Sequence, residues 1–144
     1  EIGEQNRREV MEFLSEWCEW KNCDGEPFLG FEKEALLYAL SHIQELGLSG
    51  LLIRVLDRVG AISLFEPLST DTLVVHFEKG LPDCEGIYKA INAEVATRVK
   101  DRYTFINRES DMGVPGLREA KLRYHPHHMV EVWYASRDDL EKFI

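Results

Sequence analysis

The sequence predicts one mixed α/β domain, in which helices flank a central sheet. Three observations lead to this class. Apolar residues recur at helical spacing before residue 47, three short strand-like runs follow between residues 51 and 78, and a long helical pattern then separates the third run from a fourth. Because a helix of that length can cross over a sheet, we expect the third and fourth strands to be parallel neighbours.

Two helices are expected at the start of the chain. In residues 5–20 one apolar stripe is formed by Val10, Phe13, Leu14, Trp17 and Cys18. Residues 21–30 contain two glycines and a proline, which predict a loop. The second helix is expected from Glu32 to Leu46, with Gly47 as a left-handed C-cap.

The remaining elements follow from changes of period and from turn residues. Val59-Gly60 is expected to turn the first hairpin, and Lys79–Pro82 to form a loop. Five strands are predicted: Leu51–Arg58, Ala61–Phe65, Thr72–Glu78, Tyr103–Asn107 and Met129–Ala135. Helices are predicted from Asp83 to Lys100 and from Pro115 to Tyr124, and the charged end Ser136–Ile144 is expected to be either helical or frayed. The expected order is therefore α-α-β-β-β-α-β-α-β.

The net charge of −9 is unevenly distributed along the 144 residues. Residues 1–97 carry 18 acidic and 8 basic side chains, whereas residues 98–123 carry 7 basic and 4 acidic ones. An acidic body repels a phosphate backbone, so the charge disfavours broad nucleic-acid binding by this domain alone. The basic segment can either hold one anionic group or form a solvated surface.

The cysteines and the hydropathy predict a cytoplasmic protein. Cys18, Cys23 and Cys84 form neither a CxxC pair nor a metal-like spacing, so we expect thiols in a reducing compartment. No apolar run is long enough to span a bilayer, and no signal peptide opens the chain.

A three-stranded meander followed by a crossover helix and a fourth strand resembles the GNAT acyltransferase fold. In that fold the third and fourth strands splay apart and open a cleft. The resemblance implies a cleft between Thr72–Glu78 and Tyr103–Asn107.

GNAT enzymes that use CoA hold its pyrophosphate with a loop that reads Gln/Arg-x-x-Gly-x-Gly/Ala. The corresponding residues here are Lys79-Gly80-Leu81-Pro82-Asp83-Cys84-Glu85-Gly86, whose glycine spacing differs. Pro82 lacks an amide donor, and two carboxylates near the start of the helix would repel a phosphate. We therefore expect no CoA and no other cofactor.

Polar residues follow the fourth predicted strand, where α/β folds commonly bind ligands. A carboxylate of Glu109 or Asp111 could accept a proton from an attacking amine or hydroxyl. Arg118 and Lys121 lie three residues apart on one helix face and could hold an anion. The alternative is a salt-bridged turn, in which Glu109 or Asp111 pairs with Arg108 or Arg118. The sequence leaves both interpretations open.

The histidines give weaker indications. His125, His127 and His128 are interpreted as surface residues without a metal, because neighbours on a strand point to opposite faces and no further ligands are suitably spaced. His76 lies in an apolar strand, where it can be either a packed, hydrogen-bonded histidine or a base.

A long segment of the chain resembles a known family. Residues 105–126 (FINRESDMGVPGLREAKLRYHP) look like the signature INRExDxGxxGLRxAKLSYxP of a conserved bacterial domain related to the catalytic domain of phosphatidylglycerol lysyltransferases. Residues 66–79 and the triplet Ala90-Ile91-Asn92 resemble two further segments of that family. Arg123 stands where the signature has serine, and His127-His128 where apolar or basic residues are usual.

The resemblance implies that the chain is a single GNAT-like domain spanning residues 1–144, the C-terminal half of a tandem-domain protein whose sister domain is its partner. Relatives transfer an aminoacyl group from aminoacyl-tRNA to a lipid or peptide acceptor, so aminoacyl-tRNA and a peripheral lipid are the further partners implied. The matching polar positions are Glu66, His76, Glu78, Asn92, Asn107, Glu109, Asp111, Arg118, Lys121 and Tyr124.

From these positions we form one catalytic hypothesis and two alternatives. Glu109 or Asp111 would be the general base, and Asn107 and Tyr124 would stabilise the oxyanion. Substrate would be bound by Glu66, His76, Glu78, Asn92, Arg118 and Lys121. The first alternative is a non-catalytic module that binds a ligand or packs against the sister domain. The second is an acetyl-CoA acetyltransferase.

Overall fold

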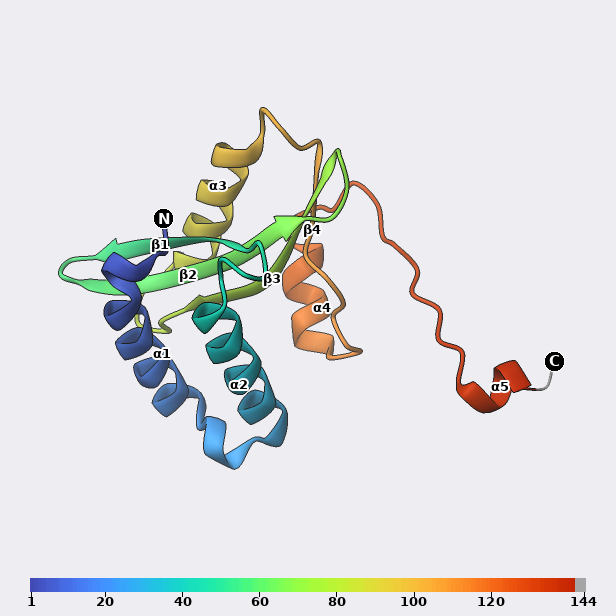
Figure 1. The fold of residues 1–144 in the computed structure, drawn as a ribbon, viewed down its shortest axis with the longest axis horizontal. Coiled ribbons are helices and arrows are strands. Elements are labelled where there is room, and N and C mark those ends of the chain that lie inside the picture. Colours follow the sequence, from blue (N-terminus) through green and yellow to red (C-terminus); the bar gives the residue numbers. More distant parts are fainter. Residues whose placement is uncertain (142–144) are drawn as a thin grey trace. The chain divides into compact units, whose positions relative to one another are not determined.

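The computed structural model describes residues 1–141 and divides the chain into two compact units, Glu1–Glu109 and Ser110–Ile144. In the first unit the elements are α1 (Arg7–Lys21), α2 (Pro27–Ser41), β1 (Ser49–Val55), β2 (Arg58–Pro67), β3 (Thr72–Gly80), α3 (Ile87–Val99) and β4 (Phe105–Asn107), together with 3-10 helices at Glu4–Asn6 and Cys23–Gly25 (Figure 1). The second unit contains α4 (Pro115–Leu122) and α5 (Arg137–Glu141).

The four strands form one mixed sheet in the order β1-β2-β3-β4. The pairs β1–β2 and β2–β3 are antiparallel, and β3–β4 is parallel. This arrangement confirms the predicted meander and crossover. The predicted turn at Val59-Gly60 is wrong, because Val55 pairs with Arg58 and the chain reverses at the two residues between them. Gly60 instead lies in a β-bulge, where a Cβ atom would meet Val55 Cγ2 at 2.8 Å.

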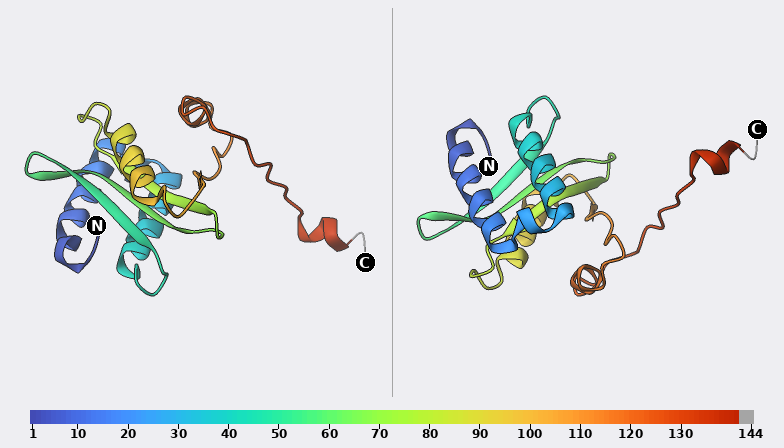
Figure 2. Two further views of the ribbon diagram at one scale, coloured as in Figure 1. Left: turned by 90° about the horizontal axis from the view of Figure 1, so that it is seen from above. Right: turned by 90° about the horizontal axis from the view of Figure 1, so that it is seen from below.

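Helices cover both faces of this sheet (Figures 1 and 2). Helices α1 and α2 pack on one face, where Trp17 and Leu36 join Ile62 and Leu64 in a buried cluster. Helix α3 packs on the other face through Ile87, Ile91, Val95 and Val99, which contact a second cluster. Most of β2 is buried, and its side chains point to both faces of the sheet, so this strand contributes to both cores.

Helix α2 begins five residues earlier than expected. Pro27 occupies its first turn, where the missing N–H costs nothing because no carbonyl precedes it in the helix. The α-helix ends at Ser41, and the chain continues in turns up to Gly47, which has φ +67°. There Leu48 N–H donates to Ile43 O at 2.9 Å and Gly47 N–H to Gln44 O at 3.1 Å. These two bonds form a Schellman motif and confirm the left-handed role of Gly47.

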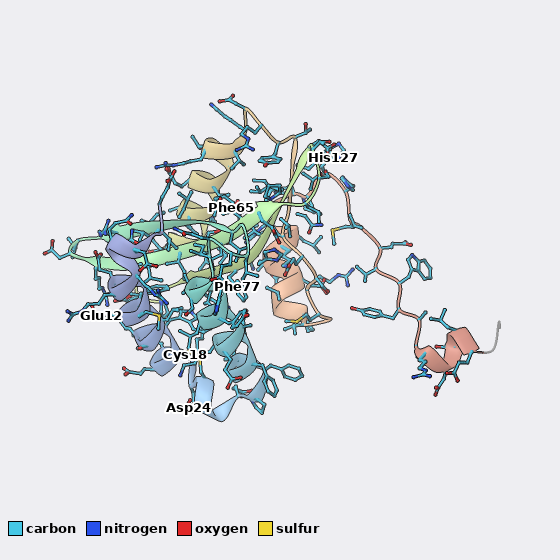
Figure 3. The ribbon with its side chains drawn as sticks, viewed as in Figure 1. Glu12, Cys18, Asp24, Phe65, Phe77 and His127 are labelled. Atoms are coloured by element: carbon cyan, nitrogen blue, oxygen red, sulfur yellow. A yellow bond between two sulfur atoms is a disulfide. The ribbon has the colours of Figure 1, made fainter. Side chains whose placement is uncertain are left out.

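Two of the three cysteines are bonded to each other, contrary to the prediction of thiols. Cys18, labelled on α1 in Figure 3, forms a disulfide with Cys23, and the two Cα atoms lie 5.1 Å apart. Cys84 is a free thiol. The bond links the last turns of α1 to the start of the connection that leads into α2.

The predicted loop at Lys79–Pro82 and the helix start at Asp83 both need correction. Lys79 and Gly80 still belong to β3, and α3 begins only at Ile87. Lys79 Nζ lies 2.7 Å from Glu32 Oε1 and 4.5 Å from the centre of the Trp17 ring, so the end of β3 is fixed against α1 and α2. Asp83 forms an ion pair with Arg58 and does not lie in the first turn of the helix.

The second unit confirms the helix from Pro115 but not the last predicted strand. Residues 129–135 have no strand partner in the part of the chain that the structure describes, and Trp133 is 85% exposed. An alternating pattern needs a neighbouring edge before it forms a strand. The predicted terminal helix is present at Arg137–Glu141, and its last three residues lie outside the described residues. Within residues 1–141 no helix is both long and apolar enough to cross a membrane.

Candidate active site

His76 is placed by an irregularity in the sheet. Phe77 pairs with Leu64, but Val75 pairs with Phe65, so β3 has one extra residue at His76. As a result Phe77 packs against the α1–α2 core, while Val75 packs against the α3 core. In a regular strand these two residues would share a face. A β-bulge re-aims the side chain that it carries, and bulges are frequent beside active sites.

Both ring nitrogens of His76 meet a carboxylate. Nε2 lies 2.8 Å from Glu66 Oε1, and Nδ1 lies 2.6 Å from Glu109 Oε1. Burial lowers the pKa of His76, but the hydrogen bonds and negative charges of Glu66 and Glu109 outweigh it, so the pKa is raised above 6.5. Because carboxylates accept but do not donate, an imidazolium is the form that satisfies both contacts.

The three side chains differ in their access to solvent. His76 is 28% exposed, Glu66 is 37% exposed and Glu109 is 47% exposed. The two hydrogen bonds therefore connect the half-buried carboxylate of Glu66, through the His76 ring, to the more exposed carboxylate of Glu109. We call these three residues the His76 triad. It can hold a proton and exchange it at its Glu109 end.

The backbone at Glu109 has an uncommon conformation. Its φ is +56°, in the left-handed region that non-glycine residues seldom adopt. The Glu109 N–H donates to Asn107 Oδ1 at 2.7 Å, which is the local turn that asparagine side chains form with the amide two residues on. Asn107 is the last residue of β4 and pairs with Val74 of β3.

A second polar group lies on the α3 side of β3. Glu78 has a side chain only 7% exposed, and Arg108 Nη2 donates to its Oε1 at 2.6 Å. Asn92 of α3 lies 3.4 Å from the other carboxylate oxygen. The register pairs Glu78 with Ser63, whose hydroxyl is buried without a hydrogen-bond partner. This network joins β3, α3 and the end of β4.

Six of the ten proposed site residues therefore lie in the first unit and form two neighbouring networks. The other four lie in the second unit, among contacts of their own. Asp111 Oδ2 is 3.6 Å from Arg118 Nη1, and its Oδ1 accepts the Gly113 N–H at 2.9 Å. Lys121 Nζ donates to Ser110 O at 2.8 Å, and Tyr124 is 38% exposed. The catalytic roles of Asp111 and Tyr124 and the substrate-binding roles of Arg118 and Lys121 stay predictions.

The sequence left two interpretations of the turn after β4, a carboxylate that acts as a base and a salt-bridged turn, and the structure gives the partners of both carboxylates. Asp111 pairs with Arg118, as the salt-bridged turn requires, whereas Glu109 pairs with His76. Arg108 was missing from the site residues proposed from the sequence. Its position between Asn107 and Glu109, two proposed site residues, could have indicated that it belongs to the site. The rings of His127 and His128 approach within 2.9 Å between Nδ1 atoms, so the strand geometry used to separate them does not apply.

The triad lies where β4 stops pairing with β3. Only Thr72, Leu73 and Val74 of β3 have partners on β4, and β3 continues to Gly80 without it. All three residues of β4 are thus paired with β3, whereas β3 continues beyond the end of β4. A hollow of about 250 Å³ lies elsewhere, beside Cys18, Cys23 and Lys33. The predicted cleft between the strands stays a prediction.

A four-stranded mixed sheet with helices on both faces, together with the similar structure that follows, identifies a GNAT-like fold. A ribosomal-protein-alanine N-acetyltransferase from Brucella melitensis biovar Abortus 2308 has a similar fold, with a TM-score of 0.61, 17% identity, and coverage of 94% of this chain and 96% of that one. At this identity the likeness concerns the fold alone.

The chain belongs to the family described as phosphatidylglycerol lysyltransferase, C-terminal, whose model matches residues 1–136. A conserved protein of unknown function from Bacteroides thetaiotaomicron VPI-5482 has a TM-score of 0.84 and 38% identity. The match covers 89% of this chain and 43% of that protein, so this chain spans less than half the length of that relative. Among curated proteins, none is significantly similar to the chain.

Proposed function

We propose that this domain takes part in aminoacyl transfer from an aminoacyl-tRNA ester to a lipid or amine acceptor, with Glu109 as the general base. The observation that carries the proposal is the His76 triad. A carboxylate that is half-exposed at one end of a partly buried series of hydrogen bonds can accept the proton of an attacking amine or hydroxyl. Membership of the phosphatidylglycerol lysyltransferase C-terminal family supports the reaction class.

The proposed step conserves protons. The acceptor nitrogen or oxygen attacks the ester carbonyl, and its proton passes to Glu109. The carbon–oxygen bond to the tRNA ribose then breaks, and the proton returns to the leaving ribose oxygen. The His76 imidazolium orients Glu109 and offsets its charge before proton transfer, while Glu66 holds the far side of the ring.

The loop before α3 supports a donor other than CoA. Pro82 has no N–H, and the N–H groups of Leu81, Cys84 and Ile87 already donate to backbone carbonyls at 2.9–3.2 Å. Asp83 adds a carboxylate paired with Arg58. A pyrophosphate cradle needs free backbone amides at a helix start. The loop offers few of them, and an ester of tRNA needs no such cradle.

The same proposal includes the surroundings of the domain. We propose that the chain is the C-terminal half of a cytoplasmic two-domain protein, that its sister domain packs against it, and that the acceptor is reached at a membrane surface. The relative from Bacteroides thetaiotaomicron, of which the match covers 43%, is in keeping with a longer protein.

The direct test compares Glu109→Gln with wild type in the protein that carries this chain. Transfer of a labelled amino acid from aminoacyl-tRNA to phosphatidylglycerol vesicles is measured. Loss of a general base should slow transfer by about 10²–10⁴-fold. Glu12→Gln, on the exposed face of α1, is the matched control and should keep the wild-type rate. A wild-type rate in Glu109→Gln removes the proposed role.

A non-catalytic module is the second candidate, because two other carboxylates of the predicted site are already paired with arginines. Glu78 meets Arg108, and Asp111 meets Arg118. A carboxylate in such an ion pair stabilises the fold and is less able to act on a substrate, because its charge is already balanced by the arginine. If the domain is a non-catalytic module, Glu109→Gln and His76→Asn should leave transfer unchanged. Substitutions on the surface that contacts the sister domain should then separate the two domains in analytical ultracentrifugation.

A further inference from the structure

We propose that Asn107 is a positioning residue, which holds the Glu109 carboxylate against His76 by fixing the backbone that follows β4. This inference rests on the proposed function, since it concerns how the general base of the same site is placed. Asn107 acts through the Glu109 backbone and not through contact with the substrate.

The first part of the case is the backbone at Glu109. A glutamate at φ +56° is disfavoured by its own Cβ, so neighbouring contacts must compensate. Among the described residues, the 2.7 Å bond from Glu109 N–H to Asn107 Oδ1 acts directly on that backbone. Asparagine forms this turn readily because its short side chain reaches the amide two residues on.

The second part is the rigidity of the two anchors. Asn107 is held by its register with Val74 in the parallel pair. His76 lies on β3, two residues after Val74, and is held there by the bulge and by Glu66. The turn at Asn107 therefore spans the distance between two fixed points of the sheet. Without it, the peptide at Glu109 can return to a common conformation, and the direction of the carboxylate changes.

The third part is the charge around the imidazole. Glu66 approaches from β2 and Glu109 from the end of β4, while Glu78 of β3 is neutralised by Arg108. Displacement of Glu109 removes one of the two carboxylates in contact with the ring. The imidazole therefore reports on the position of Glu109 independently of any transfer assay.

The experiment is a titration of the His76 imidazole by NMR in wild type, Asn107→Ala, Asn107→Asp and Glu109→Gln, with His76→Asn to assign the signal. We expect Asn107→Ala to lower the imidazole pKa by at least half of the decrease seen in Glu109→Gln. Asn107→Asp keeps the acceptor oxygen and should restore a pKa at or above that of wild type. Asn92→Ala, which changes an asparagine of the Glu78 network, should leave the titration unchanged.

One outcome overturns the proposal, an Asn107→Ala protein with the wild-type imidazole pKa. A lower melting temperature does not rescue the proposal in that case, because stability loss without a change in the titration belongs to a merely structural residue. If Asn107→Ala does not fold, Asn107→Leu takes its place, since leucine has a similar size and no acceptor, and an unchanged titration there counts equally against the proposal. A wild-type transfer rate in Glu109→Gln would instead refute the proposed function and leave the titration result standing.

Discussion

Arg108 Nη2 donates to Glu78 Oε1 at 2.6 Å and so ties the end of β4 to a carboxylate on β3 that is only 7% exposed. The two residues are 30 positions apart in the sequence. Their contact holds β4 beside β3 although only three residue pairs connect these strands. The short parallel pair and this ion pair together keep the His76 triad assembled.

Arg108→Ala should destabilise the fold strongly. Removal of the guanidinium leaves the buried Glu78 without its cation, and breaking a buried ion pair from one side costs about 3 kcal/mol or more. The free energy of unfolding in urea measures the loss. Arg8→Ala, which breaks the exposed pair with Glu12, should change it by less than about 1 kcal/mol. Equal effects of the two substitutions would mean that Glu78 is well solvated.

The stability that His76 contributes should depend on pH. Its folded pKa is raised above 6.5, so the contribution is complete below pH 6.5 and is lost as the pH rises through the folded value. The free energy of unfolding is measured for wild type and His76→Asn at several pH values from about 5 to about 9. We expect the advantage of wild type over His76→Asn to shrink as the pH rises. An advantage of wild type over His76→Asn that grows with pH would contradict a raised pKa of His76 in the triad.

Reduction of the Cys18–Cys23 disulfide should weaken the fold moderately. A bridge over five residues restricts the unfolded chain only slightly, which corresponds to about 2 kcal/mol. Urea unfolding with and without dithiothreitol measures the change. Cys84→Ser should respond to the reductant like wild type, because Cys84 has no disulfide. An identical transition under both conditions would show that the two sulfurs are not bonded in solution.

CoA should not stabilise the protein. A ligand at 100 times its dissociation constant adds about 2.7 kcal/mol, which raises the melting temperature of a domain of this size by several degrees. Since the loop before α3 has Pro82 and several amides already bonded, we expect no shift at about 1 mM CoA. A clear rise would favour the acetyl-CoA enzyme over the proposed aminoacyl transfer.

The site was only partly accessible from the sequence. The family signature pointed to Glu66, His76 and Glu109 as separate positions, and the structure brings them into one hydrogen-bonded chain. Their association depends on a one-residue bulge in β3 and on the left-handed backbone at Glu109. Neither feature has a distinctive residue pattern, because no glycine marks either place.

The local periodicity of the sequence was enough to determine α1, the three-strand meander, the crossover to a parallel β4 and the helix from Pro115. These features depend on which face of an element is apolar and on residues close in the chain. Tertiary structure alone decided the β1–β2 turn, the late start of α3, the Cys18–Cys23 bond and the absence of a strand at residues 129–135. The start of α3 is preceded by Asp83, whose partner Arg58 lies 25 residues away, and residues 129–135 have no strand partner among the described residues. The β1–β2 turn and the disulfide join residues close in the chain, but the strand register and the packing of α1 bring those residues together. A pattern of side chains shows that an element can pair, but only the packed chain supplies the neighbour.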